Sequence, residues 1–366
     1  MKIVITGACA VSARSVLRSL KLSDFFKDAE FIGWDLADNL YGLYEGLFNK
    51  VYKVPGVNDE SYRKIIEKIL NEEKPDAVIV VPEIEVLYWS KNPFDVPHLV
   101  PPASFCELAI SKRKLFNLLK SSNLVPESYE IEKVKILSED FVTPLSYPLW
   151  IRDSAAGTAS GKGSFAANNI EELKAWVMIN TGIDQFQLSQ FLPGSNYGCF
   201  CLFHDGQLKK IAIAERINYI MAKVAVSGIT GNTSKGRLLN DENIKNVALD
   251  TIDKVAKFTN TKMHGLVVVD MKCDENNMPK VTEINIRHVA FSSSFAKAGF
   301  NLSEAHLLCT LERINELTPE IEKEYPQNNL LLRDVDGLPI YVENYQPIET
   351  GGCINKEILL KTQTKK

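Results

Sequence analysis

Two apolar strands joined by a polar turn are the feature that most constrains this chain. Residues 265–270 and 281–287 have the apolar and β-branched content of strands, and residues 274–279 between them are rich in turn-forming residues. The pattern predicts a β-hairpin. Because side chains alternate along a strand, Glu283, Asn285 and Arg287 are expected on one face. The residues between and before them, Thr282, Ile284 and Ile286, are expected on the other.

The position of the turn predicts which residues face each other. If the hairpin is symmetric about the bond between Asn276 and Asn277, Asp270 lies directly opposite Glu283. Opposed residues in antiparallel strands have Cβ atoms about 4.5–5.5 Å apart, and like charges repel at that spacing. The prediction therefore requires something that offsets the repulsion.

A hard divalent cation would offset it. Asp270, Glu283 and the amide oxygen of Asn285 form a set of oxygen ligands that suits Mg²⁺, which keeps waters and binds substrate phosphates. Arg287, one step further on the same face, would meet the anionic end of the ligand that the metal holds. The alternative is a hairpin whose polar face is solvated, with Arg287 paired to Glu283.

Composition excludes several classes of function. The 366 residues are enough for two or three domains, and 45% apolar and 24% charged residues are typical of a globular protein. A net charge of −4 gives no basic footprint, so nucleic acid is not an expected partner. No run approaches the roughly 18 apolar residues of a membrane helix. We expect no membrane partner, and the short apolar run that ends at Gly7 predicts a buried strand rather than a signal peptide.

The cysteines and histidines predict a cellular compartment and argue against a zinc site. The seven cysteines are odd in number and scattered, which predicts reduced thiols in a cytoplasm. The five histidines have no metal-ligand spacing, so zinc chemistry is not expected.

The first hundred residues alternate strand and helix. Strands are predicted at residues 2–6, 30–35 and 77–81, and helices at 12–22 and 59–73. This order predicts a parallel α/β sheet, in which ligands bind beyond the carboxyl ends of the strands.

Gly7, Asp35, Glu83 and Glu85 fall at those strand ends. A glycine turn followed by an acid at the end of the second strand is compatible with a nicotinamide-dependent enzyme. The turn after Gly7 lacks the second and third glycines that let a pyrophosphate approach, so a structural or substrate-facing turn is the favoured interpretation.

The next region carries cations and a glycine-rich loop. A helix is predicted at residues 107–120 with Lys112 in a basic cluster, and a strand at residues 147–152 ends in Arg152. The Gly- and Ser-rich residues 157–164 do not have Walker A spacing. With a cation at the end of the preceding strand, they predict a lid whose backbone amides cover phosphates; the alternatives are a glycine-rich surface hairpin and a solvated basic helix face.

The following segments place an adenine site and two loops. A strand at residues 185–191 leads into residues 192–196, where an adenine could dock on backbone amides. A second hairpin is predicted at residues 197–213. Residues 215–239, with Arg216 and three further cations, predict either a mobile loop over the acceptor substrate or an ordinary surface loop. Near the end, residues 330–333 and 338–342 predict a hairpin.

In this order the features resemble the ATP-grasp superfamily, most closely one synthetase unit of the carbamoyl-phosphate synthase large subunit. The matching features are Lys112 on a helix, Arg152 before a glycine-rich loop, Phe191-Leu192-x-Gly194, Gly265 to Asp270, Glu283-x-Asn285-x-Arg287, and Ser292-Ser293-Ser294 followed by Gly299. The resemblance spans roughly residues 2–310.

The resemblance implies an α/β and α+β architecture. A parallel α/β pre-ATP-grasp domain would occupy residues 1–104, followed by a two-lobed ATP-grasp core at residues 105–310. A nucleotide lobe (about 105–188) and a metal-binding lobe (about 189–310) would make up the core, and residues 311–366 a C-terminal extension.

It also implies roles for individual residues. The nucleotide-binding positions are Lys112 and Arg152 on the phosphates, Gly157, Ser160, Gly161 and Gly163 in the lid, Gln190, Phe191 and Leu192 at the adenine hinge, and Asn196 near the ribose. Asp270, Glu283 and Asn285 match the ligands of Mg²⁺, with Mn²⁺ as a substitute. Arg287 and Arg152 match the catalytic cations. Glu83 and Glu85 are candidates for the acceptor substrate.

The implied activity is an ATP-dependent carboxylate–amine ligase. Members of the superfamily activate a carboxylate as an acyl phosphate and join it to an amine, so the expected partners are small carboxylates and amines, with a homodimer left open. The chain has Gln190 and Asn196 where acids are common, and Asp270 where the synthase has glutamine. It has one unit and no glutaminase portion, so complete carbamoyl phosphate synthesis is not expected. A nucleotide-sensing module without turnover is the alternative.

Overall fold

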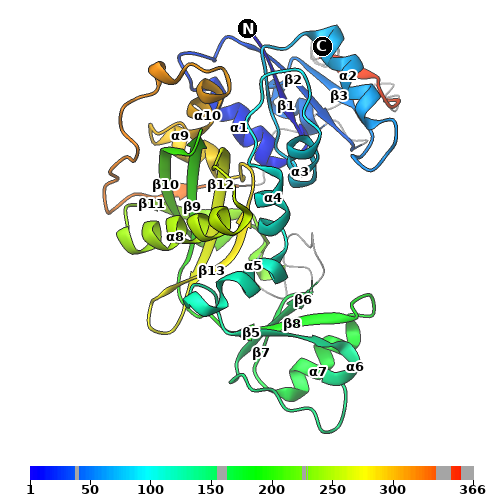
Figure 1. The fold of residues 1–366 in the computed structure, drawn as a ribbon, viewed down its shortest axis with the longest axis vertical. Coiled ribbons are helices and arrows are strands. Elements are labelled where there is room, and N and C mark those ends of the chain that lie inside the picture. Colours follow the sequence, from blue (N-terminus) through cyan, green and yellow to red (C-terminus); the bar gives the residue numbers. More distant parts are fainter. Residues whose placement is uncertain (38–40, 155–162, 225–227, 229, 335–347, 356–366) are drawn as a thin grey trace, which may run out of the picture.

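Three β-sheets succeed one another along the molecule (Figure 1). The computed structural model describes residues 1–37, 41–154, 163–224, 228, 230–334 and 348–355. A five-stranded sheet lies at the top of Figure 1, a six-stranded sheet in the middle and a four-stranded sheet at the bottom. The mixed α/β and α+β class predicted from the sequence is confirmed.

The N-terminal sheet is mainly parallel, as predicted. Its order is β15-β3-β2-β1-β4, and only β15 runs antiparallel to its neighbour. The elements are β1 (Lys2–Thr6), α1 (Val11–Lys21), β2 (Glu30–Asp35), the 3-10 turn Tyr41–Gly46, β3 (Lys50–Lys53), α2 (Tyr62–Glu73), β4 (Ala77–Ile79), α3 (Glu83–Lys91) and β15 (Cys353–Asn355). Strand β1 is buried because helices cover both faces of a parallel sheet.

The structure differs from the sequence predictions at three places in this domain and just after it. Strand β3 has only four residues and was not predicted. Glu83 and Glu85 do not follow a strand end directly but lie in the first turn of α3, because Pro82 begins a helix there. The helix predicted at residues 107–120 is two helices, since Ser111 breaks the run and accepts a hydrogen bond at 3.4 Å from the backbone N–H of Lys114.

These two helices link the upper domain to the lobes below it. They are α4 (Ala103–Ala109) and α5 (Lys112–Leu119), and α5 lies between the six-stranded and four-stranded sheets (Figure 1).

The six-stranded sheet has the order β13-β12-β9-β10-β11-β14. Its elements are β9 (Asn196–His204), β10 (Gln207–Tyr219), β11 (Thr233–Leu239), α8 (Glu242–Thr259), β12 (Gly265–Cys273), β13 (Pro279–Asn285), α9 (Ser292–Lys297), α10 (Leu302–Thr310) and β14 (Leu331–Leu332). One face packs against α8, with Cys199, Val267 and Ile252 in the shared core. The opposite face packs against α9 and α10 at one end, and its other end carries the polar residues described below.

Residues 215–239 are not one long loop. Strand β10 continues to Tyr219 and pairs with β11, so both ends of the segment belong to an antiparallel ladder. The alternation of alanines and isoleucines before Arg216 continues the strand into the segment predicted as a loop.

The four-stranded sheet has the order β5-β8-β6-β7 and is antiparallel throughout. Its elements are β5 (Ser128–Glu132), α6 (Lys133–Ile136), β6 (Leu149–Asp153), β7 (Phe165–Ala167), α7 (Ile170–Ile179) and β8 (Gln185–Gln190). Helices α6 and α7 cover one face, and α5 approaches the other.

The C-terminal segment joins two sheets. Strand β14 pairs with β11, and β15 pairs with β3 of the N-terminal sheet. Before β14, the segment is held by the Lys210 ammonium, which donates to the Thr318 carbonyl and hydroxyl, both at 2.7 Å, and to the Glu320 carbonyl at 2.5 Å. The predicted hairpin partner at residues 338–342 lies outside the described residues.

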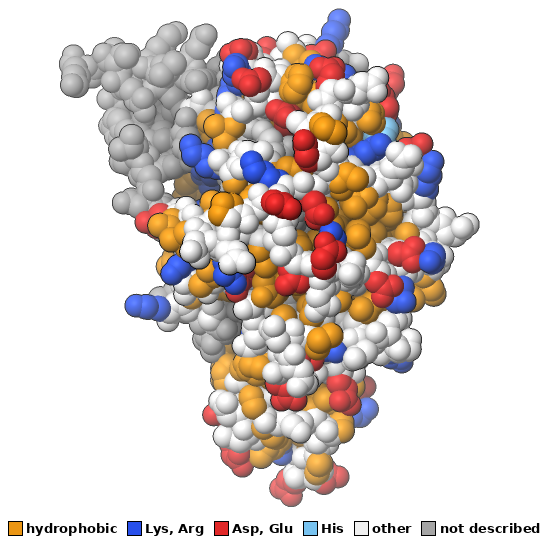
Figure 2. All heavy atoms as spheres, turned by 90° about the vertical axis from the view of Figure 1, so that its left-hand side faces the viewer, with side chains coloured by type: hydrophobic (Ala, Val, Ile, Leu, Met, Phe, Trp, Pro, Cys, Tyr) orange, Lys and Arg blue, Asp and Glu red, His pale blue; other side chains and the backbone are white. Residues whose placement is uncertain are grey.

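The surface carries charges of both signs. On the face drawn in Figure 2, acidic and basic side chains are interspersed among apolar ones rather than gathered into a single basic area. Among the described helices, none has both the length and the apolar content needed to cross a membrane.

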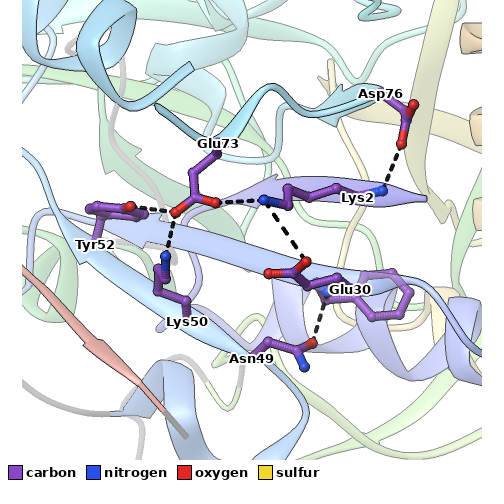
Figure 3. Close-up of polar contacts among 8 residues, drawn as sticks. Lys2, Glu30, Asn49, Lys50, Tyr52, Glu73 and Asp76 are labelled. Carbon is purple, nitrogen blue, oxygen red and sulfur yellow. Dashed lines mark hydrogen bonds and ion pairs between the residues drawn. The ribbon is translucent and has the colours of Figure 1, made fainter. Parts of the chain in front are cut away.

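A buried ion cluster closes the amino-terminal edge of the parallel sheet (Figure 3). Glu73, the last residue of α2, accepts hydrogen bonds from Lys2 Nζ at 2.9 Å, Lys50 Nζ at 2.5 Å and Tyr52 OH at 2.5 Å. Burial opposes the ionisation of Glu73, but these donors outweigh it and lower its pKa to about 2. The carboxylate is therefore fully paired by the sheet itself.

Candidate functional site

The predicted register of the central hairpin is confirmed: Asp270 on β12 pairs with Glu283 on β13. The route to that register differs from the one assumed. Near the turn the pairs are centred on Asn276, and a β-bulge between Met271 and Asp270 shifts the register by one residue. Without the bulge Asp270 would face Thr282, so the bulge brings the two carboxylates together.

Asp270 is held by a guanidinium from the neighbouring hairpin. Arg216 on β10 donates Nη2 to Oδ1 of Asp270 at 2.5 Å and Nη1 to Oδ2 at 2.9 Å. Asn285 Nδ2 donates to the same Oδ2 at 3.2 Å. Burial and the opposing Glu283 raise the pKa of Asp270, and Arg216 counters them.

Glu283 is held from the other side. Lys112, the first residue of α5, places its ammonium 3.1 Å from Glu283 Oε2. Burial opposes ionisation, but Lys112, Arg152 and Arg216 together lower the pKa of Glu283 to about 2. The pKa of Asp270 is therefore raised and that of Glu283 lowered, as expected when two like charges share one site.

Arg152 reaches this group from the four-stranded sheet. Its Nε donates to Gln187 Oε1 at 2.7 Å, and its guanidinium lies 5.1 Å from the ring centre of Phe116 on α5. Burial lowers the pKa of Arg152 to about 10 against the pull of Glu283, which still leaves it charged at neutral pH. The side chain thus brings a cation from the second lobe to the acidic pair.

Arg287 and Glu83 bring the N-terminal domain to the same group. Arg287 Nε lies 3.9 Å from Glu83 Oε2, and Arg287 Nη1 donates to the His288 carbonyl at 3.0 Å. Burial raises the pKa of Glu83, Arg287 and Lys112 lower it, and Glu283 raises it further. Glu83 is therefore in electrostatic contact with the predicted metal and phosphate residues.

Glu85 does not belong to this group, contrary to the expectation from sequence. It is buried in the core of the N-terminal domain, where Oε1 accepts from Trp34 Nε1 at 3.0 Å and from Tyr62 OH at 2.7 Å. Two residues along a helix point about 200° apart, so Glu83 and Glu85 could not both face the same site.

The predicted hinge lies where β8 meets β9. The backbone N–H of Gln190 donates to the Glu127 carbonyl at 2.8 Å, and Leu192 is buried. The Phe191 ring lies under the Lys272 ammonium at 5.2 Å. Asn196 Oδ1 lies 3.4 Å from Arg216 Nη1, which connects the hinge to the acidic pair.

Of the predicted lid, only its far end is described. Gly163 has φ +67°, and a Cβ there would lie 2.6 Å from Ile183 Cδ1, so glycine is required for this turn. Gly157, Ser160 and Gly161 lie outside the described residues.

The turn at Gly7 has a structural explanation. Gly7 has φ +67°, and a Cβ there would lie 2.6 Å from Pro82 Cγ. The Asp35 carboxylate accepts from the backbone N–H of Cys9 and of Ala37, both at 2.9 Å. These contacts account for the glycine and the acid by loop packing, which is the interpretation the sequence favours.

The donor set fits a divalent cation that shares its coordination with a ligand. Two opposed carboxylates and one amide are oxygen donors of the kind that Mg²⁺ takes together with phosphates. No three His, Cys, Asp or Glu side chains converge as a metal site in the described ranges, so protein atoms alone would not complete the coordination. Both carboxylates are also engaged by protein cations.

Sequence reasoning missed three residues of this site. Arg216 was assigned to a loop, and Tyr219 and Lys272 were not singled out. Lys272 lies two residues after Asp270 on the same face of β12, a spacing that could have revealed it. Arg216 and Tyr219 could be found only by extending the alternation of β10.

Comparisons with known proteins identify the fold. No protein-family model matches the sequence, and no curated protein does. The solved phosphoribosylamine–glycine ligase from Thermotoga maritima is 16% identical with a TM-score of 0.63, over 88% of this chain and 78% of that one. The L-amino acid ligase from Bacillus licheniformis is 16% identical with a TM-score of 0.61, over 87% and 77%.

The D-alanine–D-alanine ligase from Bacillus anthracis, solved with ATP, is 13% identical with a TM-score of 0.54, over 86% of this chain and 99% of that one. At such identities the likeness establishes the architecture alone. It agrees with the N-terminal α/β domain and the two-lobed core found here. The architecture that the resemblance implied is therefore confirmed: in fold, the chain is similar to these three solved ligases.

Proposed function

We propose that this protein is an ATP-dependent ligase that activates a carboxylate as an acyl phosphate and joins it to an amine. The observation that carries the proposal is the convergence of charged side chains on the opposed pair Asp270 and Glu283, from the six-stranded sheet, the four-stranded sheet and helices α3 and α5. The cations are Lys112, Arg152, Arg216 and Arg287, and the third acid is Glu83. Cations outnumber acids in this group, which suits a polyanion such as a nucleotide triphosphate.

The residues divide the work by position. Lys112 and Arg152 would contact the phosphates of ATP, with residues 157–164 as the lid over them. Residues 190–192 and Asn196 would hold the adenosine. Asp270, Glu283 and Asn285 form the place for Mg²⁺ or Mn²⁺, which when bound supplies positive charge to the phosphate oxygens.

Such a site acts by positioning and charge. The transferring phosphoryl group spreads negative charge over its oxygens, and fixed cations stabilise that charge better than mobile water does. Arg287, two residues after the end of β13, would hold the carboxylate that becomes the acyl phosphate. Glu83, 3.9 Å from Arg287, would bind the amine and accept its proton, a role that suits a carboxyl whose pKa is raised by burial.

Several finer assignments belong to the same proposal. The domain boundaries at residues 104 and 310, a cytoplasmic location and small-molecule partners follow from the sequence interpretation. The proposal also keeps the likeness of this ligase to one carbamoyl-phosphate synthase unit, from which it differs at Asp270, where the synthase has glutamine.

The first test is ligand-dependent thermal stability. A ligand at 100 times its dissociation constant stabilises a protein by about 2.7 kcal/mol, which shifts the melting temperature measurably. We expect ATP with Mg²⁺ to stabilise more than ATP with EDTA, and NADH to have no effect. ADP release would then be screened with paired amino acids and other carboxylates. Stabilisation by NADH alone would move the ligand site to the Gly7 turn and refute the proposal.

A second candidate is a nucleotide sensor without turnover. It is favoured by Gln190 and Asn196, which replace acids at the nucleoside side while Asn196 remains in contact with Arg216. Stabilisation by ATP and Mg²⁺ without ADP release in any substrate pair would support it over the ligase.

A further inference from the structure

We propose that Arg216 is a phosphate-binding cation of this site and that Asp270 is its positioning residue. This narrows the metal ligands from the set Asp270, Glu283 and Asn285 given above to Glu283 and Asn285. This inference rests on the proposed function. It divides the acidic pair into one residue that binds the metal and one that holds a guanidinium.

The contacts of Asp270 leave it little capacity for a metal. Both of its oxygens accept from Arg216, at 2.5 and 2.9 Å, in the parallel two-bond geometry in which a guanidinium binds a carboxylate. Oδ2 accepts a third bond from Asn285 Nδ2. The side chains of Arg216 and Asp270 are only 14% and 8% exposed. Removing Arg216 would leave a buried unpaired carboxylate, which is strongly unfavourable.

Glu283 differs in both respects. Its side chain is 37% exposed, and its ion pair with Lys112 at 3.1 Å involves Oε2. It is therefore the accessible acid of the pair, and the one that an incoming cation can reach without breaking a bidentate pair.

Asn285 is oriented toward the same division. A carboxylate only accepts hydrogen bonds, so the amide nitrogen of Asn285 must face Asp270. Its carbonyl oxygen is then turned away from Asp270 and can serve as an oxygen donor beside Glu283. Asn285 thus contacts Asp270, which positions Arg216, through its amide nitrogen, and its carbonyl oxygen is left for the metal beside Glu283.

The surroundings of Arg216 point to an anionic ligand. Tyr219 lies beside Arg216, and in the described part of the chain its buried hydroxyl has no hydrogen-bond partner other than that guanidinium. Residues three apart on a regular strand face opposite sides, but β10 has register shifts between Arg216 and Tyr219 that bring both to one place. A phosphate oxygen would accept from both side chains.

Gly198 gives the ion pair its space. It pairs with Asp270 across β9 and β12, and a Cβ there would lie 3.0 Å from Arg216 Nη2 and 3.4 Å from Asp270 Oδ1. The guanidinium is therefore seated against backbone, where it keeps one orientation.

Two binding measurements separate the roles. ATP affinity is measured by calorimetry in EDTA, where no metal contributes, and Mn²⁺ affinity by electron paramagnetic resonance without nucleotide. We expect Arg216→Met and Asp270→Asn each to weaken ATP binding in EDTA about 10-fold to 100-fold, the range of a lost charged hydrogen-bonding group. The double variant should bind ATP no more weakly than the single variant with the lower ATP affinity, because the two residues act as one unit.

Mn²⁺ binding should respond differently. Glu283→Gln should raise the Mn²⁺ dissociation constant at least 10-fold, and Asp270→Asn should change it less than threefold. If Asp270→Asn instead matched Glu283→Gln in Mn²⁺ binding while ATP binding in EDTA was unchanged, Asp270 would be a metal ligand and the inference would be wrong.

The neighbouring ion pair provides a matched control. Arg237 on β11 pairs with Glu215 on β10, on the opposite face of the same ladder, so Arg237→Met removes an equivalent cation without touching the site. It should leave ATP affinity unchanged. Arg216→Lys and the Arg216→Met, Asp270→Asn double variant avoid a lone buried carboxylate if Arg216→Met folds poorly.

The two levels of proposal fail separately. Wild-type protein that binds no ATP, with or without Mg²⁺, would refute the proposed function. If folded Arg216→Met bound ATP as tightly as the wild type does, only the assignment of Arg216 would be refuted.

Discussion

Glu73 and Glu283 are both ionised acids with a pKa of about 2, yet their surroundings differ in kind. Glu73 accepts from three donors, Lys2, Lys50 and Tyr52, and its own sheet supplies them all (Figure 3). Glu283 faces another carboxylate, and its cations come from three different parts of the fold. The first arrangement is complete without a ligand, and the second is not.

Their places in the fold explain the difference. The Glu73 cluster lies at the amino-terminal edge of the parallel sheet, where the strands begin, whereas ligands bind at the opposite edge of such sheets. Opposed carboxylates in a sheet repel each other, so a chain that keeps them retains them for something other than stability. A fully paired buried acid therefore indicates structure, and an opposed pair indicates a ligand.

Glu283→Gln should break this comparison most clearly. It keeps the shape of the side chain and removes the charge, so ADP release should fall about 100-fold or more, the usual effect of losing a fixed electrostatic group. The free energy of unfolding should change by less than about 1 kcal/mol, because the Lys112 pair is partly exposed and repulsion from Asp270 is relieved. Coupled ADP assays and urea unfolding measure both. A large loss of stability with normal turnover would reverse the assignment.

Glu73→Gln should show the opposite pattern. Its loss leaves Lys2 and Lys50 without their buried partner, so the free energy of unfolding should fall by about 2–3 kcal/mol, while ADP release stays within about twofold. Glu30→Gln is the matched control in the same cluster, since Glu30 is exposed and lies 3.9 Å from Lys2. Its effect on unfolding should be near zero.

Acid unfolding sharpens the contrast further. The pKa of Glu73 is lowered from 4.5 to about 2, so its stabilising contribution is fully present above pH 4.5 and disappears as the pH falls toward 2. The difference in unfolding free energy between wild type and Glu73→Gln should shrink over that window, as measured by urea titrations at several pH values. A difference that stayed constant from pH 6 to pH 2 would show that the carboxylate charge is not what stabilises the cluster.

Gly198→Ala should give the smallest effect. The added methyl group would force the Arg216 and Asp270 pair to move by a few tenths of an ångström, so ATP affinity should fall about 3-fold to 10-fold with little change in melting temperature. Gly182→Ala is the control, because a Cβ there meets nothing within 4 Å. Unchanged ATP affinity in Gly198→Ala would mean that ATP binding does not depend on the exact position of the Arg216 guanidinium.

Local patterns predicted much of the architecture. The alternation of strands and helices before residue 82 predicted the parallel sheet, because apolar runs of that length and order have few other ways to bury themselves. The hairpin that pairs Asp270 with Glu283 was also predicted correctly, although its turn lies half a residue away from the assumed centre. A bulge that sequence patterns do not reveal compensated for that difference.

The failures have a common cause. Glu85 and Arg216 carry the same local signals as functional and loop residues respectively, and only their neighbours in space distinguish them. Trp34 and Tyr62 bury Glu85 from elements far along the chain, and Gly236 on β11 pairs with Arg216. Such contacts depend on chain folding over long sequence separations, which side-chain periodicity does not record.

The sequence by itself determined most of the elements, the hairpin with its acidic stripe and an order of motifs that resembles the ATP-grasp superfamily, because these depend on local hydrophobic pattern and turn chemistry. Only the tertiary structure decided which cations meet the acids. These cations come from α5 (Lys112), β6 (Arg152), β10 (Arg216) and the segment after β13 (Arg287). Electrostatic partners are determined by distance in space rather than by distance along the chain.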